Sequence, residues 1–70
     1  MMKISARNQF HGTISELEEG AVNAIVVLDI GGGNHITATI SKRAVHDLGL
    51  KVGSPASALI KATSVMIATE

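Results

Sequence analysis

Residues 5–9, Ser-Ala-Arg-Asn-Gln, form the most polar stretch of this chain and are the first group of side chains that could bind a ligand. Hydroxyl, amide and backbone N–H groups donate hydrogen bonds there, and the Arg7 guanidinium presents a planar fork of charged donors. Such a set suits a tetrahedral oxyanion, because charge-assisted hydrogen bonds are the strong ones. The competing interpretation is a polar N-terminal tail ahead of the first strand, and the residues alone leave both open.

A second polar group, Lys-Ala-Thr-Ser at residues 61–64, interrupts an apolar run near the other end of the chain. Lysine is rarely buried without a partner, so Lys61 either faces solvent or has an anionic partner. In the second case Thr63 and Ser64 add hydroxyl donors beside the ammonium group. If this segment meets Arg7, two cations can neutralise a dianion.

Other kinds of chemistry find no support in the sequence. Gly-Gly-Gly-Asn at residues 31–34 lacks the following helix and Lys of a phosphate loop, and it predicts a hairpin loop with positive φ. The chain has no Cys, and its three His are too scattered for a metal site. The Glu cluster at residues 16–19 is typical of a solvated turn, and no nucleophile motif is present, so we predict that the protein is not an enzyme.

The two polar segments must be positioned by the rest of the chain, and its hydrophobic pattern predicts mostly β-strands. Alternating or apolar runs predict strands over residues 9–18, 21–30, 36–40 and 56–68, the last bent near residues 61–64. On the first strand one face is expected to carry Phe10, Gly12, Ile14 and Glu16. On the second, one face is expected to carry Val22, Ala24, Val26, Leu28 and Ile30.

The hydrophobic period changes after the third strand. Ser41 is predicted to cap a short helix over residues 42–48, which packs through Ala44, Val45 and Leu48 and ends at Gly49. The order of elements, three strands, a short helix and a last strand, predicts an all-β fold. If the last apolar run is broken into two strands, the fold is a five-stranded, OB-like Greek-key barrel with one short helix between the third and later strands. Residues 1–70 are expected to form a single domain.

Composition narrows the classes of function. A chain of 70 residues that is 46% hydrophobic and has no Cys needs a partner copy to bury enough surface, so we expect a homo-oligomer. The net charge is zero, and the chain has a single Phe and no Tyr or Trp. Both features disfavour nucleic-acid binding, which uses positive charge and stacking aromatic rings. No apolar run approaches the roughly 20 residues of a membrane span, and no leader opens the chain. A cytoplasmic location without membrane contact is therefore expected.

The chain resembles the molbindin (Mop) family, whose module is the TOBE domain. The resemblance rests on motifs that follow one another in the family's order at residues 5–9, 20–24, 36–38, 48–50 and 60–65. Members are small cytoplasmic proteins that bind molybdate. This chain has no DNA-binding or ATPase portion, so it looks like the stand-alone storage form.

The resemblance implies an OB-like fold in a hexamer, a trimer of dimers, with molybdate or tungstate bound at subunit interfaces. It implies that Ser5 and Arg7 bond the oxyanion, that Ala6 and Asn8 lend backbone groups, and that Lys61, Ala62 and the helix-cap hydroxyl of Ser41 contribute. Ala44 stands where many members have Ser, which puts one ligand in doubt. The implied role is intracellular molybdenum storage or homeostasis, without metal ligation by side chains. The alternative is an oxyanion-sensing module that signals to a protein partner.

Overall fold

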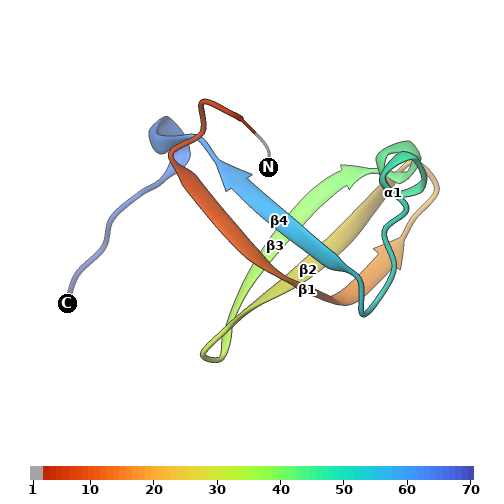
Figure 1. The fold of residues 1–70 in the computed structure, drawn as a ribbon, viewed down its shortest axis with the longest axis horizontal. Coiled ribbons are helices and arrows are strands. Elements are labelled where there is room, and N and C mark those ends of the chain that lie inside the picture. Colours follow the sequence, from red (N-terminus) through yellow and green to blue (C-terminus); the bar gives the residue numbers. More distant parts are fainter. Residues whose placement is uncertain (1–2) are drawn as a thin grey trace.

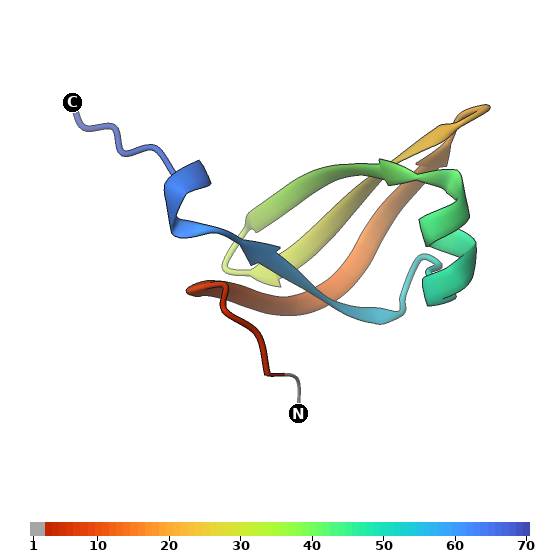
Figure 2. The same ribbon diagram turned by 90° about the horizontal axis from the view of Figure 1, so that it is seen from above.

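An antiparallel sheet that curls along its length is the main element of the protein (Figures 1 and 2). The computed structural model describes residues 3–70. The strand order in the sheet is β3-β2-β1-β4, so β2 and β1 lie in the middle. The elements in chain order are β1 (Asn8–Glu19), β2 (Asn23–Gly31), β3 (Asn34–Ser41), α1 (Lys42–Leu48), β4 (Pro55–Ile60) and a 3-10 turn, η1 (Ala62–Ser64).

The glycine cluster joins β2 to β3 as a hairpin loop, as predicted. Gly31, Gly32 and Gly33 have φ values of 94°, 65° and 78°, which residues with a side chain rarely adopt. The carboxylate of Asp29 accepts a hydrogen bond from the Gly31 N–H at 2.9 Å and closes the turn. The cluster therefore has a conformational role.

A bulge in β1 changes which residues face inward. Ile14 pairs with Leu28 and Glu16 with Val27, so Ser15 is an extra residue between them. The prediction that Glu16 shares a face with Ile14 is therefore wrong, and Leu17 takes the inward position, where it packs against the core. The bulge bends β1 and helps the sheet to curl.

The hydrophobic core is small and aliphatic. Its buried members are Ile14, Ala24, Val26, Leu28 and Val45. Partly buried apolar side chains surround it, including Leu17 from β1 and Ile36 and Ile40 from β3. Of the predicted inward positions on β2, Val22 lies outside the strand and is 73% exposed. The core is therefore built around one face of β2, to which every second residue of the strand belongs.

The short helix lies across one end of the sheet, capped as predicted. Ser41 Oγ accepts a hydrogen bond from the Ala44 N–H at 3.0 Å, and Gly49 ends the helix at φ 65°. Val45 is buried, whereas Leu48 is 68% exposed, so the prediction that Leu48 packs inward is wrong for the single chain. Leu48 lies at the edge of a groove that the chain leaves open. No helix among residues 3–70 is long and apolar enough to cross a membrane.

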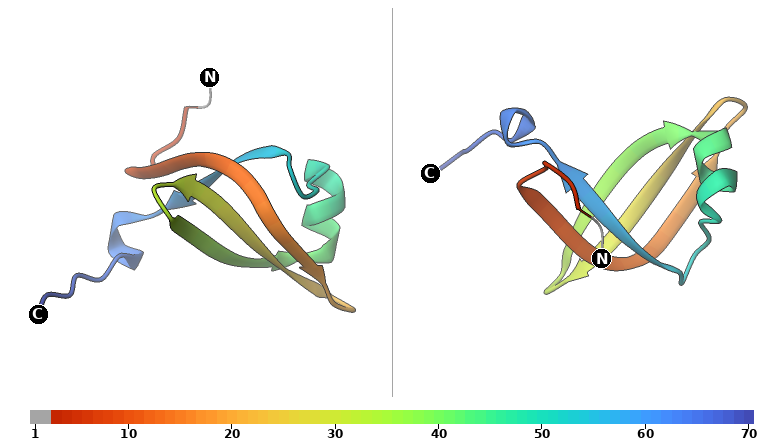
Figure 3. Two further views of the ribbon diagram at one scale, coloured as in Figure 1. Left: turned by 90° about the horizontal axis from the view of Figure 1, so that it is seen from below. Right: turned by 45° about the horizontal axis from the view of Figure 1, so that its top comes forward.

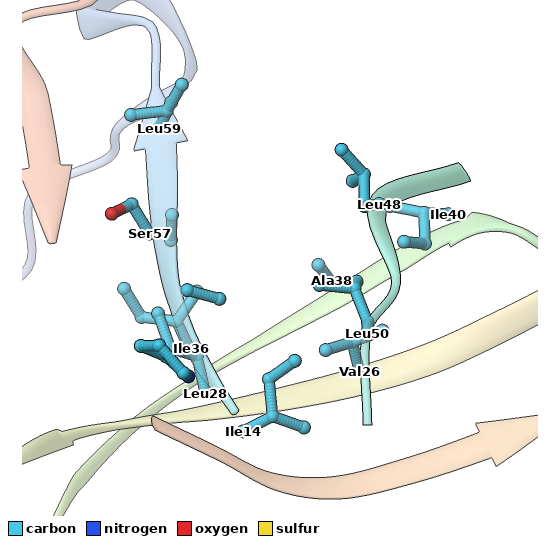
Figure 4. A pocket seen from close by; sticks show the side chains of 13 residues that line it. Ile14, Val26, Leu28, Ile36, Ala38, Ile40, Leu48, Leu50, Ser57 and Leu59 are labelled. Carbon is cyan, nitrogen blue, oxygen red and sulfur yellow. The ribbon is translucent and has the colours of Figure 1, made fainter. Parts of the chain in front are cut away.

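The sheet forms an all-β, OB-like half-barrel that stays open between β3 and β4. In the part of the chain described by the structure, four strands form and the outer edges of β3 and β4 are unpaired. Between them lies an apolar groove of about 530 Å³ (Figure 4). The last apolar run does break in two, because η1 turns the chain after β4. Its second half, residues 65–70, is extended and exposed and has no strand partner among residues 3–70 (Figure 3).

Candidate oxyanion-binding site

The pairing of β1 with β4 brings the two polar segments to the same end of the molecule. Asn8, the first residue of β1, is in register with Ile60, the last residue of β4. The Asn8 side-chain amide also donates to the Ile60 carbonyl oxygen at 3.2 Å. Residues 5–7 and 61–64 therefore leave adjacent strand ends.

The N-terminal segment is held in place but keeps its hydrogen-bond donors free. Gln9 Nε2 donates to the Ala6 carbonyl oxygen at 3.1 Å, which folds the segment back over the start of β1. Within residues 3–70, neither the Ala6 nor the Arg7 backbone N–H donates to a protein acceptor. Ser5 and Arg7 are exposed, and Ala6 is half-buried. These free donors are available to an acceptor from outside the chain.

The second segment forms a tight turn directly after β4. The Ser64 N–H donates to the Lys61 carbonyl oxygen at 2.8 Å, and the Val65 N–H donates to the Ala62 carbonyl oxygen at 3.3 Å. No side chain caps the start of this turn. Lys61 interrupts the apolar run because the strand ends there. Its side chain is exposed in the single chain, and no described carboxylate lies within ion-pair distance of it.

Charge is distributed unevenly between the two ends of the sheet. The ion pairs formed by the described residues join Arg43 to Asp47 at 3.8 Å and His46 to Glu19 at 3.3 Å, and both involve α1. At the opposite end, Arg7 and Lys61 have no carboxylate partner among residues 3–70. This end presents two cations, hydroxyl groups and free N–H groups, a set suited to a dianion that only accepts hydrogen bonds.

Ser41 lies far from this group. It pairs with Asn23 at the end of the sheet where β1 finishes, whereas Asn8 begins β1 at the other end. Twelve residues of strand separate the two ends, which is on the order of 35 Å along the strand. One chain therefore brings together Ser5, Ala6, Arg7, Asn8, Lys61 and Ala62, but not Ser41. Ala44 is adjacent to the Ser41 cap and has no hydroxyl to add.

Two side chains have roles that the sequence did not reveal. The Asn8 amide ties β1 to β4, and the Gln9 amide orients Ala6, so both position the segment around Arg7. Their only sequence signal is the pair of amides that follows Arg7 at the start of a strand. The scattered histidines form no metal cluster with acidic residues in the described part of the chain. His11 Nδ1 lies 2.6 Å from Ser57 Oγ on the exposed surface.

Comparison with known proteins identifies the family of the chain. Residues 4–67 match the TOBE domain family. A "Probable molybdenum-pterin-binding protein" of Haemophilus influenzae is 58% identical over 69 residues, which is 99% of this chain and 100% of the relative. The solved structure of MopII from Clostridium pasteurianum superposes with a TM-score of 0.89 at 49% identity, covering 96% of this chain and 100% of that chain.

A ligand-bound structure is also similar. The cytoplasmic molybdate-binding protein ModG, solved with molybdate bound, superposes with a TM-score of 0.84 at 52% identity over 87% of this chain and 43% of that chain. The open OB-like half-barrel places the chain in a class of small all-β domains. The chain belongs to the TOBE domain family and, within it, to the molbindin (Mop) proteins.

Proposed function

We propose that the protein binds molybdate through the donor-rich end of the half-barrel. The observation that carries this proposal is the convergence of Arg7 and Lys61, both without a carboxylate partner among residues 3–70, at strand ends held together by Asn8. Arg7 and Ser5 donate to the anion, Ala6 and Asn8 lend backbone groups, and Lys61 and Ala62 complete this side of the site. The molybdenum-pterin-binding relative and molybdate-bound ModG support this choice of ligand.

The site discriminates between anions by size and protonation. Molybdate and tungstate have longer metal–oxygen bonds than the S–O bonds of sulfate, so donors spaced for the larger anions leave long hydrogen bonds around sulfate. Phosphate carries a proton near neutral pH and would place it against a site made of donors. We expect tungstate to bind as molybdate does.

The binding site is completed between subunits. Ser41 lies at the opposite end of its own chain, so it reaches the same anion only if a neighbouring copy supplies it. The open groove and the exposed apolar side chains also favour assembly. We propose a hexamer built as a trimer of dimers, with anions at its interfaces, and a five-stranded barrel once assembled.

The biological role that follows is storage or homeostasis of molybdenum in the cytoplasm, without catalysis. The description of ModG as cytoplasmic supports the location. A second role, sensing of the oxyanion followed by a signal to a protein partner, is favoured by one feature. Ile25 on β2 and Val52 in the loop before β4 are 43% and 61% exposed and line one surface patch together with Glu16 and Glu18. In this second role the patch stays exposed after assembly and binds the partner.

Native mass spectrometry with and without molybdate tests the proposal, because it reports the number of chains and of anions together. We expect a hexamer that retains a fixed number of molybdate ions in the presence of excess sulfate. Titration calorimetry with molybdate, tungstate and sulfate then ranks the anions. Equal affinity for molybdate and sulfate, or no retained molybdate, would contradict the proposed function.

A further inference from the structure

The three histidines of the chain differ in the charged groups beside them. His46 Nε2 lies 3.3 Å from Glu19 Oε1. His35 is in register with Asp29 on the neighbouring strand, which puts a carboxylate on the same face beside it. His11 forms no ion pair with any carboxylate of residues 3–70. When protonated, His11 is therefore the histidine whose positive charge no directly paired carboxylate balances.

His11 lies on the face of β1 over which the N-terminal segment folds. Gln9 and His11 are two residues apart in a regular part of the strand, so their side chains share this face. Gln9 Nε2 donates to the Ala6 carbonyl oxygen at 3.1 Å, which holds Ala6 close to it. Three residues of strand separate His11 from Asn8, a distance on the order of 10 Å. His11 is therefore a neighbour of the proposed oxyanion site without belonging to it.

The contact of His11 with β4 allows it to gain a proton without disturbing the sheet. Its Nδ1 atom lies 2.6 Å from Ser57 Oγ across the β1–β4 pair. A hydroxyl group both donates and accepts hydrogen bonds, so a neutral Nδ1 accepts from Ser57 and a protonated one donates to it. Protonation thus adds a charge at this position and keeps the contact between the strands.

The charged groups around His11 leave this added charge in a mainly cationic setting. Strand β4 carries no charged side chain. On β2, Asp29 is in register with Thr13, so its carboxylate lies diagonally across from His11 and opposes its charge only in part. The charged side chains of residues 3–8 and 61–64 are all cations, namely Lys3, Arg7 and Lys61. An anion bound between these segments is attracted by a protonated His11 as well.

We propose that protonation of His11 raises the affinity of the oxyanion site, so that anion binding strengthens as the pH falls through the neutral range. Histidine changes its charge between about pH 5 and 8. At about 10 Å, a unit charge attracts a dianion enough to raise its affinity about 4-fold even at the dielectric constant of water. Salt above about 0.1 M screens most of this attraction. This inference rests on the proposed function and adds to it the group that sets its pH dependence.

Titration calorimetry with molybdate at low ionic strength tests this role. The affinity at about pH 6 should be at least about 3-fold higher than at about pH 8. His11→Gln keeps a side chain that forms hydrogen bonds but carries no charge, so it should bind with the lower affinity at both pH values. His11→Lys is charged at both and should bind with similar, higher affinity at both. An unchanged ratio of affinities in His11→Gln would overturn the proposal.

The other two histidines provide matched controls. His35→Gln and His46→Gln each remove one imidazole that has a carboxylate beside it, and both should keep the ratio of the original protein. If either variant loses the ratio while His11→Gln keeps it, the pH dependence comes from that imidazole and the proposal is wrong. Circular dichroism of each variant at both pH values checks that the fold is retained.

Proton uptake gives a second measurement. Because coupling between two ligands is reciprocal, an anion that binds the protonated form more tightly also promotes protonation. Calorimetry near neutral pH in two buffers of different ionisation enthalpy should show that the original protein takes up a fraction of a proton per anion. His11→Gln should take up clearly less. Equal proton uptake by the two proteins would contradict the role of His11.

These outcomes separate the role of His11 from the proposed function. A protein that binds molybdate equally well at both pH values upholds the function and contradicts the role of His11. A protein that binds no molybdate at either pH contradicts both.

Discussion

Arg7 and Lys61 carry the same charge but offer different geometries to an anion. A guanidinium holds its donors in a fixed plane, whereas an ammonium is a compact charge on a flexible stem. The Gln9–Ala6 and Asn8–Ile60 hydrogen bonds hold the backbone on either side of Arg7, so they restrict the position from which its side chain extends. In the proposed site we therefore expect Arg7 to contribute to specificity through the direction of its donors and Lys61 chiefly to neutralise charge.

Arg7→Lys tests the directed role. We expect molybdate affinity to fall about 10- to 150-fold, the range for a hydrogen bond to a charged group. Selectivity over sulfate should also weaken, because a mobile ammonium can follow the smaller anion inward. Competition calorimetry of molybdate against excess sulfate measures both. If affinity and selectivity stay the same, Arg7 acts only as a source of positive potential.

Lys61→Met tests charge neutralisation. An anion that loses one of two cations in a desolvated site keeps part of its charge uncompensated, so molybdate affinity should fall at least about 30-fold. Lys61 is exposed and unpaired within residues 3–70, so the free energy of unfolding of the ligand-free protein should change little. Lys51→Met is the control, because Lys51 is exposed in the loop before β4 and lies outside the candidate site. Unchanged affinity in Lys61→Met would place its ammonium in solvent in the assembly as well.

At the scale of elements, the bend of β1 positions the candidate site relative to the groove. Gly12 lies where β1 passes against the backbone of β2, and a Cβ at this position would collide with the Asp29 carbonyl oxygen. Two backbones this close leave no room for a side chain. The bend depends on this contact as well as on the bulge at Ser15.

Gly12→Ala tests the close approach. The added methyl group must push β1 away from β2, and overpacking of this kind costs about 1–3 kcal/mol of the free energy of unfolding. Thr13→Ala, an exposed change on the next residue, should cost much less. Chemical denaturation followed by circular dichroism compares the two variants. Equal stability of Gly12→Ala and the original protein would mean that the strands can separate here without loss.

The sequence predicted the elements better than their contacts. Periodicity located β2 and β3, and Ser41 and Gly49 set the ends of α1, because these signals act within a few residues. The Ser15 bulge and the exposure of Leu48 were missed. A bulge depends on pairing with a distant strand, and Leu48 is exposed because it lines a groove that the single chain leaves open.

The candidate site was predictable only in part, because local signals can be read from the sequence and long-range strand pairing cannot. Local composition pointed to residues 5–9 and 61–64, and the β1–β4 register places the ends of these segments on adjacent strands. Spacing along the chain could not show that Ser41 lies at the opposite end, because that follows from the antiparallel pairing of β2 with β3. The amide hydrogen bonds of Asn8 and Gln9 likewise form only in the folded chain, so composition could not show them.

At the scale of the whole molecule, folding, assembly and ligand binding should be linked. The described residues bury only a small aliphatic core, and several large apolar side chains stay exposed that the proposed assembly would cover. The folded subunit is then stabilised by mass action, both by other subunits and by any anion that bridges them. Unfolding temperature should therefore rise with protein concentration even without ligand.

Molybdate should raise the unfolding temperature further. If one anion binds per chain, ligand at 100 times its dissociation constant contributes about 2.7 kcal/mol per chain. In a domain of this size each kcal/mol shifts the midpoint by about 4–8 °C, so the expected rise is about 10–20 °C. Scanning calorimetry at two protein concentrations, with molybdate or an equal concentration of sulfate, measures both effects. Sulfate should raise the midpoint by much less, and Arg7→Lys should lose part of the molybdate increment while keeping the concentration dependence. A midpoint that is independent of protein concentration but raised by molybdate would place the site within one subunit, which contradicts the requirement for Ser41 of a second copy.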